Sequence, residues 1–445
     1  MTAASALLDA AARVRALPFD RRFGRVTGVR GAMLEVGGLG SAVSVGARLA
    51  IADGRGGAVA AEVTALDGPR VAAMPFADPV GIACGARADL LAPAMSVRPC
   101  DGWLGRVVDG LGSAADGRGS LPQGAAPRPV RALPPPATER GRVGARVDTG
   151  VAALDAFAPL CAGQRLGLFA GSGVGKSTLM SMLARWTACD VAVIGLVGER
   201  GREVTEFVED SLGPEGLARS VVVAATSDEP AVMRRQAAWT TLAVAEHFRD
   251  QGAHVLLLMD SVTRFAMAQR EIGLASGEPP ATRGYTPSVF AELPRLLERA
   301  GPGVAGQGSI TALFTVLVDG DDHNEPVADA VRGILDGHVV MSRRIAERGR
   351  FPAVDVLRSV SRTLPGALGP EENRARLAAR ALLALNEDMD EMVRLGAYKA
   401  GSNAEVDRAV ALAPRIEALL SQDGARRWHA GELFAQLAAL VDGPA

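Results

Sequence analysis

The stretch Leu166–Thr178 reads LGLFAGSGVGKST and decides the fold. Leu166–Phe169 is a strand-sized apolar run, and the residues after it approach the pattern G-x-x-x-x-G-K-[ST], with Ala170 in place of the first glycine. A strand, a glycine-rich loop and a helix in this order form a phosphate site, because loop N–H groups and the helix N-terminus point at the anion. Lys176 is expected to reach the β- and γ-phosphates and Ser177 to ligate Mg²⁺. The predicted nucleotide contacts are Gly171, Ser172, Gly173, Val174, Gly175, Lys176, Ser177 and Thr178.

Two acidic residues follow predicted strands and are candidates for holding the metal and the attacking water. Asp260 follows the apolar run Val255–Met259, where a Walker B carboxylate holds Mg²⁺, although an Asp at a strand end is often only a helix N-cap. Glu199 follows the run Val191–Val197. Because ligands of a parallel sheet lie at the carboxyl ends of its strands, Glu199 is placed to orient or deprotonate water. The alternative is an ordinary surface glutamate in a loop.

From about Gln164 the sequence alternates short apolar runs with helical stretches. This alternation predicts a mostly parallel sheet covered by helices on both faces, an α/β fold. The expected strands are Leu166–Phe169, Val191–Val197, Val221–Ala225, Val255–Met259 and Ile310–Val318. The helices expected between them include Lys176–Thr187 and Ala231–Arg249. After Pro370 the sequence is expected to be helical, at Glu371–Leu395, Glu405–Leu420 and Ala425–Val441.

The N-terminal part of the chain has a different texture. Short apolar runs between glycine-rich turns predict a small β-barrel or sandwich, with strands at Gly24–Val29, Ala32–Val36, Val43–Leu49 and Ala58–Leu66. Residues 95–150 are rich in glycine and proline and are expected to form long connecting loops. We therefore expect four parts: a basic helical segment (1–22), a β-barrel (23–95), a nucleotide-binding domain (96–370) and a C-terminal helical domain (371–445).

The composition limits the classes of function. The chain has 445 residues, 48% of them hydrophobic, and a formal net charge of −2. That balance disfavours a general nucleic-acid binder, which needs a broad basic face. The apolar runs fall short of the ~18–20 residues that span a bilayer, and Asp9 within the first apolar stretch makes a poor signal peptide. The first thirty residues contain six arginines and two aspartates. This basic segment suits binding to anionic lipid or to an acidic partner. The alternative is an ordinary solvent-exposed terminal helix.

With these motifs the chain resembles the type III protein-export ATPases, most closely the flagellar branch. That family is related to the catalytic subunits of rotary ATP synthases. Ala170 at the first P-loop position is typical of the export branch. The segments that carry the resemblance are Ala170–Thr178, Gly198–Glu203, Ala225–Pro230, Leu257–Arg264, Asp319–Asp329 and Ser359–Arg362. It implies an N-terminal β-barrel, a central RecA-like P-loop domain and a C-terminal helical domain.

The resemblance also implies roles for residues that physical reasoning leaves open. It matches Glu199 to the catalytic carboxylate, and Arg200 and Arg264 to arginines near the γ-phosphate. It matches Glu203 to an acidic residue beside the metal, and Arg362 to a finger supplied across a subunit interface. The implied enzyme hydrolyses MgATP as a homo-hexameric ring, because one protomer alone has an incomplete site.

The family's partners and location are implied by the same resemblance. They are an N-terminal regulator protein, a coiled-coil stalk protein, export-gate membrane proteins, and export substrates with their chaperones, at the cytoplasmic face of the inner membrane. The four cysteines form no C-x-x-C pair and are expected to be free thiols. Leu317 stands where synthase subunits carry an aromatic residue on adenine, so adenine packing is expected to be looser or supplied elsewhere, with Tyr398 as one candidate.

Several alternatives stay open at this point. A virulence-type secretion ATPase shares the motifs, although Asp321–Pro326, DDHNEP, favours the flagellar branch. Leu317 and the weakly charged loop 397–405 oppose a rotary synthase subunit, and the scarcity of Tyr and Trp opposes a ring nucleic-acid translocase. Asp319–Glu325 is dense in acids and resembles a metal site, but is expected to be a structural loop. A non-catalytic ring subunit is opposed by the joint presence of Lys176, Glu199, Asp260 and Arg362.

Overall fold

The computed structural model describes residues 22–318 and 325–443, which divide into two compact units. Of the described residues, the smaller unit contains 22–95 together with Leu274–Glu278, and the larger unit contains the rest. The basic helical segment expected at residues 1–22 lies outside the described residues except for Arg22, as does all of the acidic segment Asp319–Glu325 except its last residue.

The smaller unit is a closed antiparallel barrel. Within the described residues six strands form it, in the order β1-β2-β5-β4-β3-β6. Alternate side chains, among them Leu34, Leu49 and Ile51, point inward and fill an apolar core. The strand expected at Val43–Leu49 begins only at Arg48, because a turn with Gly46 at a φ of 90° precedes it. The strands are β1 Phe23–Arg30, β2 Met33–Gly37, β3 Arg48–Ala52, β4 Ala58–Asp67, β5 Arg70–Pro75 and β6 Arg87–Ala92.

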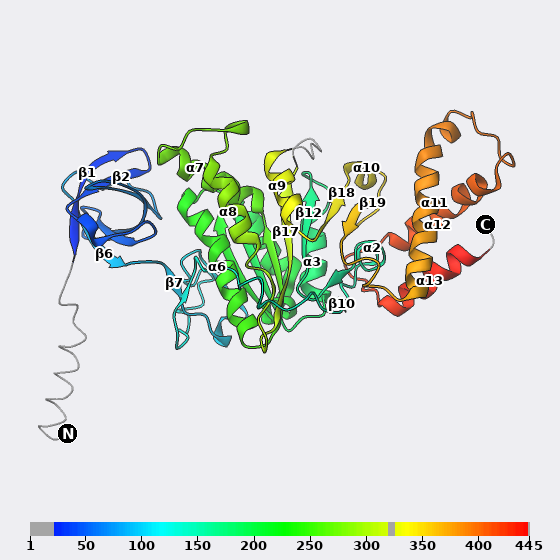
Figure 1. Ribbon diagram of the computed structural model, residues 1–445, viewed down its shortest axis with the longest axis horizontal. Helices are drawn as coiled ribbons and strands as arrows, with labels where there is room; N and C mark the ends of the chain where they lie inside the picture. The colour runs from blue at the N-terminus through cyan, green and yellow to red at the C-terminus, as the bar shows by residue number, and fades with distance from the viewer. Residues whose placement is uncertain (1–21, 319–324, 444–445) are drawn as a thin grey trace, which may run out of the picture. The chain divides into compact units, whose positions relative to one another are not determined.

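A mostly parallel sheet forms the centre of the larger unit (Figure 1). In the part of the chain that the structure describes, its order is β19-β18-β12-β17-β15-β13-β14-β8, and β16 (Gly301–Pro302) pairs with β17. Of the pairs in that order, only β18–β19 is antiparallel. The strands are β8 Arg106–Val108, β12 Arg165–Ala170, β13 Val191–Glu199, β14 Ser220–Thr226, β15 His254–Asp260, β17 Ser309–Leu317, β18 Gly337–Met341 and β19 Val354–Ser361.

Helices cover both faces of this sheet, as the side-chain alternation of β13 demonstrates. Ile194 and Leu196 belong to the apolar cluster that contains residues of α3. Gly195 points to the opposite face, where an added Cβ would lie 2.6 Å from Thr241 Oγ1 of α6, so glycine allows the helix its close approach. The helices of this region are α2 Ala152–Phe157, α3 Lys176–Trp186, α4 Gly201–Glu206, α5 Gly213–Ala218, α6 Ala231–Asp250, α7 Val262–Ala275, α8 Pro287–Leu297, α9 Pro326–Ile334 and α10 Arg343–Glu347.

Three helices end the described chain and share the core of the larger unit. They are α11 Pro370–Arg394, α12 Ala404–Leu420 and α13 Ala430–Asp442. Leu383, Ile416 and Leu433 lie in the same apolar cluster as α3. Helix α13 begins later than the expected Ala425, because the Asp423 carboxylate accepts the N–H groups of Ala425 and Arg426 in a turn. None of the helices in the described stretches has the length and apolarity that crossing a membrane requires.

The region expected to be long loops contributes a strand to the central sheet. Arg106–Val108 pairs in parallel with Val221–Val223 of β14, so β8 forms an edge of the sheet. Short two-residue strands also occur there, at β7 Ser96–Val97, β9 Arg128–Pro129 and β10 Arg146–Val147, which pairs with β11 Leu160–Cys161. Segments this short carry too little hydrophobic periodicity to be recognised among glycines and prolines.

Candidate active site

The loop between β12 and α3 forms a cradle for phosphate. Gly173 and Gly175 have φ angles of 78° and 84°, where any other residue would be strained. Helix α3 begins at Lys176, so its unpaired N–H groups point into the loop. Val174 differs from the other predicted contacts, because its side chain is buried in the apolar core. The pocket at this loop is lined by Ala170, Gly171, Ser172, Gly173, Gly175, Lys176, Ser177, Thr178, Gly198, Glu199, Arg200, Glu203, Ser227, Arg264, Leu317 and Val318.

Two neighbouring strands and the first residue of α3 bring two carboxylates and a lysine together beside the cradle. Lys176 Nζ lies 2.5 Å from Asp260 Oδ1 and 3.8 Å from Glu199 Oε1. Asp260 ends β15 and Glu199 ends β13, and these two strands are adjacent in the sheet. Thr315 of β17 donates its hydroxyl to Asp260 Oδ1 at 2.6 Å. The ammonium partly neutralises both acids, which allows them to lie close to one another at the carboxyl edge of the sheet.

Glu199 has the electrostatics of an acid–base residue. Its pKa is raised to about 7, mainly by burial and then by the Asp260 carboxylate, while the charge of Lys176 opposes the shift. Its Oε1 atom is buried and receives no hydrogen bond from the residues that the structure describes. A carboxyl group with a pKa near neutrality can take a proton and release it again, which is the requirement for a general base.

Two arginines and a second glutamate surround Glu199. Gly198, at a φ of 73°, brings the chain so close to α7 that an added Cβ would lie 3.0 Å from Arg264 Cβ. Arg200 Nη1 lies 2.9 Å from Glu203 Oε1 on the first turn of α4. Burial opposes ionisation of Glu203, but its hydrogen bond with Glu199 and the charge of Arg200 lower the pKa below the ordinary value. Glu203 therefore stays ionised, and Glu199, whose pKa is the higher of the two, is the carboxylate that more readily accepts a proton.

The donor set fits a divalent ion held chiefly by phosphate oxygens and water. In residues 22–318 and 325–443 no three His, Cys, Asp or Glu side chains are grouped as a metal cage. Ser177 and Asp260 both lie at the cradle and offer the hydroxyl and the carboxylate that P-loop enzymes use for Mg²⁺. Glu199 Oε1 is buried and accepts no hydrogen bond from the described residues, so its lone pairs remain available to a water molecule.

Arg362 lies near the amino ends of the parallel strands, at the end of the sheet opposite to the phosphate loop. Its N–H donates to the carbonyl oxygen of Asp336 at 3.0 Å, and the N–H of Asp336 donates to Arg165 O at 2.9 Å, where β12 begins. The phosphate loop follows Ala170 at the far end of the same strand. Six residues of strand span roughly 20 Å, so the Arg362 main chain is about that far from its own phosphate loop. The structure thus brings together the other predicted site residues but not Arg362.

An aromatic residue that the sequence pattern did not single out lies against the phosphate loop. A Cβ added at Gly175 would be 3.3 Å from Cδ1 of Phe351, whose side chain is 42% exposed. Tyr398 instead donates its hydroxyl to Asp407 Oδ1 at 2.9 Å, beside the α11–α12 loop, and does not line the pocket. The available signal was a phenylalanine between Arg350 and Pro352, in a chain that is only 4% aromatic.

Comparison with known proteins agrees with this geometry. Residues 150–361 match the nucleotide-binding domain of the ATP synthase alpha/beta family, and residues 368–439 match the C-terminal domain of the T3SS EscN ATPase. A flagellum-specific ATP synthase of Caulobacter vibrioides is 54% identical over 424 residues, covering 94% of this chain and 96% of that protein.

Solved structures extend the likeness to three dimensions. The assembled ATPase EscN from the enteropathogenic E. coli type III secretion system is 38% identical with a TM-score of 0.87, over 94% of this chain and 100% of EscN. EscN in complex with its central stalk EscO gives 38% identity and a TM-score of 0.85 over the same shares. The predicted fold class and the resemblance are both confirmed. The chain therefore belongs to the family of flagellum-specific and type III secretion ATPases, P-loop enzymes that hydrolyse ATP.

Proposed function

We propose that this chain is the ATPase of a flagellar type III export apparatus and couples MgATP hydrolysis to release and unfolding of chaperone-bound substrates. The observation that supports this mechanism is the grouping of Lys176, Glu199 and Asp260 at the cradle, while Arg362 lies at the opposite end of the parallel strands. A flagellar relative reaches 54% identity, whereas a type 3 secretion system ATPase of Xanthomonas euvesicatoria reaches 46%, which favours the flagellar over the virulence assignment.

The residues of the cradle divide the chemistry between them. N–H groups of the loop and the Lys176 ammonium bind the β- and γ-phosphates. Ser177 and Asp260 would hold Mg²⁺, and Glu203 would be a further acidic group near the metal. Bound Mg²⁺ neutralises charge on the phosphate oxygens. Glu199 orients the attacking water and accepts its proton. The water oxygen bonds to the γ-phosphorus as the bridging P–O bond breaks, and the electron pair stays on ADP.

Charge that develops on the γ-phosphate needs cations close to it. Arg200 and Arg264 line the pocket beside Glu199 and supply part of that charge. Arg362 of a neighbouring subunit supplies the rest, in a homo-hexameric ring in which each interface completes one site. The assembled state of EscN supports this arrangement.

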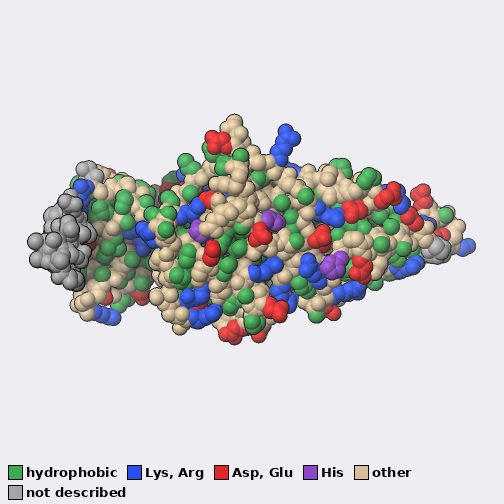
Figure 2. Space-filling model, turned by 90° about the horizontal axis from the view of Figure 1, so that it is seen from below, with side chains coloured by type: hydrophobic (Ala, Val, Ile, Leu, Met, Phe, Trp, Pro, Cys, Tyr) green, Lys and Arg blue, Asp and Glu red, His purple; other side chains and the backbone are tan. Residues whose placement is uncertain are grey.

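The partners proposed for the ring come from its family. The complex of EscN with its central stalk EscO supports a coiled-coil stalk partner for this chain. The segment 1–22 would bind a regulator protein or anionic lipid, and the ring would work at the cytoplasmic face of the inner membrane, with the export gate. Basic and acidic side chains are interspersed on the face drawn in Figure 2, which favours protein partners over nucleic acid.

Assembly is testable through the rate of hydrolysis. If Arg362 acts in a neighbour's site, ATPase activity per protomer rises steeply with protein concentration as rings form. Molar mass should be recorded by light scattering on the same samples. A constant rate per protomer from a persistent monomer would contradict the shared site and require a finger within one subunit.

Phe351 is proposed to stack on the adenine, with Leu317 at the pocket wall. Base–aromatic stacking contributes ~1–3 kcal/mol, so Phe351→Ala should weaken ATP binding by about tenfold. Binding of inorganic tripolyphosphate, which has no base, should not change. Phe23→Ala is the matched control, because Phe23 is 43% exposed but lies in the barrel. Equal loss of ATP and tripolyphosphate binding would place Phe351 in a structural role instead.

A further inference from the structure

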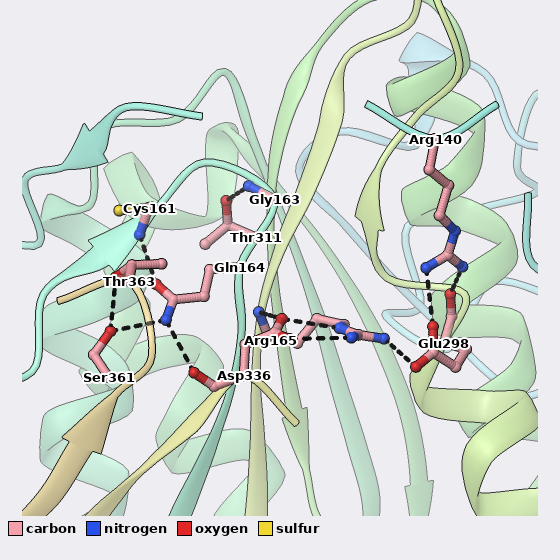
Figure 3. A network of polar contacts seen from close by, with 10 residues as sticks. All are labelled: Arg140, Cys161, Gly163, Gln164, Arg165, Glu298, Thr311, Asp336, Ser361 and Thr363. Atoms are coloured by element: carbon pink, nitrogen blue, oxygen red, sulfur yellow. Dashed lines mark hydrogen bonds and ion pairs between the residues drawn. The ribbon is translucent and has the colours of Figure 1, made fainter. Parts of the chain in front are cut away.

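A buried glutamine ties together the segment that carries Arg362. Gln164, just before β12, is fully buried. Its Nε2 donates to Ser361 Oγ at 2.8 Å and to Asp336 O at 3.3 Å, and its Oε1 accepts the N–H of Cys161 at 2.9 Å (Figure 3). One side chain therefore joins three separate segments of the chain at the edge of the sheet where β19 ends.

Residues on both sides of Arg362 take part in this network. Ser361 donates its hydroxyl to Pro159 O at 3.0 Å, and its Oγ lies 2.8 Å from Thr363 Oγ1. Thr363 Oγ1 is also 3.5 Å from Gln164 Oε1. The Arg362 N–H is held by Asp336 O. Arg362 is exposed, and among the described residues no hydrogen bond or ion pair engages its guanidinium.

Asp336, which accepts the Arg362 N–H, is itself held by a chain of charges. Its carboxylate accepts from Arg165 Nε at 3.1 Å and from Arg165 Nη2 at 3.2 Å. Arg165 Nη1 lies 2.7 Å from Glu298 Oε1 at the end of α8, and Arg140 Nη1 lies 2.9 Å from Glu298 Oε2. Figure 3 shows these pairs beside the Gln164 contacts. Asp336 is therefore held through its carbonyl oxygen by Gln164 and through its carboxylate by Arg165.

We infer that Gln164 is a positioning residue for the arginine finger, fixing the end of β19 so that Arg362 is presented to the nucleotide of the next subunit. This inference rests on the proposed role of Arg362. A buried polar network in which each group is paired fixes one geometry, whereas an apolar contact allows many. A misplacement of ~1 Å costs about 10²-fold in rate, and a finger is worth ~10³–10⁵.

Gln164→Leu removes the amide and keeps most of its volume. We expect kcat of the assembled ring to fall by about 10–100-fold, while the Kd of isolated protomers for a fluorescent ATP analogue stays within about twofold. Gln236→Leu is the matched control, because Gln236 is also buried, at 1% exposure, but its amide donates to Thr240 within α6. The control should lose stability without the loss of kcat.

Mixed rings separate positioning from structural damage. A Gln164→Leu protomer keeps its own cradle, so mixing it with Glu199→Gln protomers, whose fingers are intact, should restore activity at the shared interfaces. If Arg362→Ala is rescued in this assay and Gln164→Leu is not, the inference is overturned and the proposed function stands. If Arg362→Ala is not rescued either, the proposal of a site shared between subunits is contradicted, and the inference about Gln164 is contradicted with it.

A second variant covers failure of the first to fold. Thr363→Val keeps the shape of the half-buried side chain and removes the hydroxyl that contacts Ser361 and Gln164. For Thr363→Val we expect kcat to fall by a smaller factor than for Gln164→Leu. We also expect the nucleotide Kd to stay unchanged and activity to be rescued in mixed rings. Full activity of Thr363→Val in rings, together with an unfolded Gln164→Leu, would assign Gln164 to stability and overturn the positioning role.

Discussion

Replacing Glu199 by glutamine abolishes ATP hydrolysis and leaves nucleotide binding intact, if Glu199 is the catalytic base. The amide keeps the shape of the side chain at the end of β13 but cannot take a proton from water. The phosphate loop, Lys176 and Asp260 are unchanged by the substitution. Loss of a general base costs ~10²–10⁴-fold, so kcat for phosphate release at saturating ATP should fall by about that factor.

The control for this variant is the same substitution on an exposed residue close by. Glu206 lies on α4 with its side chain exposed, so Glu206→Gln should keep the wild-type rate. Binding of a fluorescent ATP analogue should stay within about twofold in both variants. A Glu199→Gln protein that retains most of its activity would remove Glu199 from the reaction and leave the water to be activated by another group.

The electrostatics of Glu199 explain why this residue suits the role. Glu199 ends a strand adjacent to β15, so burial and the Asp260 carboxylate both raise its pKa. The charge of Lys176 opposes this shift and reduces the repulsion between the two carboxylates. The sequence predicts that Glu199 follows a strand, but the pKa depends on which strand is the neighbour. That order becomes known only from the sheet, because β13 and β15 are separated in the chain by β14 and α6.

The phosphate cradle was predictable because its chemistry is local. Leu166–Thr178 contains the strand, the glycines at positive φ and the first turn of α3 in one continuous run. The same holds for Asp260, whose strand is a plain apolar run. These elements match the structure to within one or two residues because the hydrophobic pattern and the ligand geometry require the same backbone.

The proposed adenine contact of Phe351 and the path of β19 were not predictable in this way. Phe351 reaches Gly175 only because the chain turns back after β18 and runs antiparallel to it. The same reversal carries Arg362 to the edge opposite the phosphate loop. Neither residue has a local signal for its location, since both depend on pairing between segments far apart in the sequence. A resemblance could suggest the role of Arg362, but only the sheet gives its position.

Arg362→Ala is expected to leave ATP binding by isolated protomers unchanged and to remove activity from the assembled ring. Because the Arg362 main chain lies roughly 20 Å from its own cradle, the substitution cannot disturb phosphate binding in the same subunit. Arginine fingers are worth ~10³–10⁵ in rate, so kcat should fall by a factor in that range. Arg358→Ala is the control and should retain most activity, because Arg358 lies on β19, just before Arg362, and its guanidinium is paired to Asp355 at 2.7 Å.

The strongest form of this test mixes two inactive proteins. In rings formed from equal amounts of Arg362→Ala and Glu199→Gln protomers, about a quarter of the head-to-tail interfaces combine an intact cradle with an intact finger. Activity should therefore reappear on mixing, to about that fraction if sites act independently, and should scale with the product of the two protomer fractions. A finger acting within its own subunit predicts no recovery at any ratio. Because each parent is inactive alone, the recovered rate itself measures the shared interface.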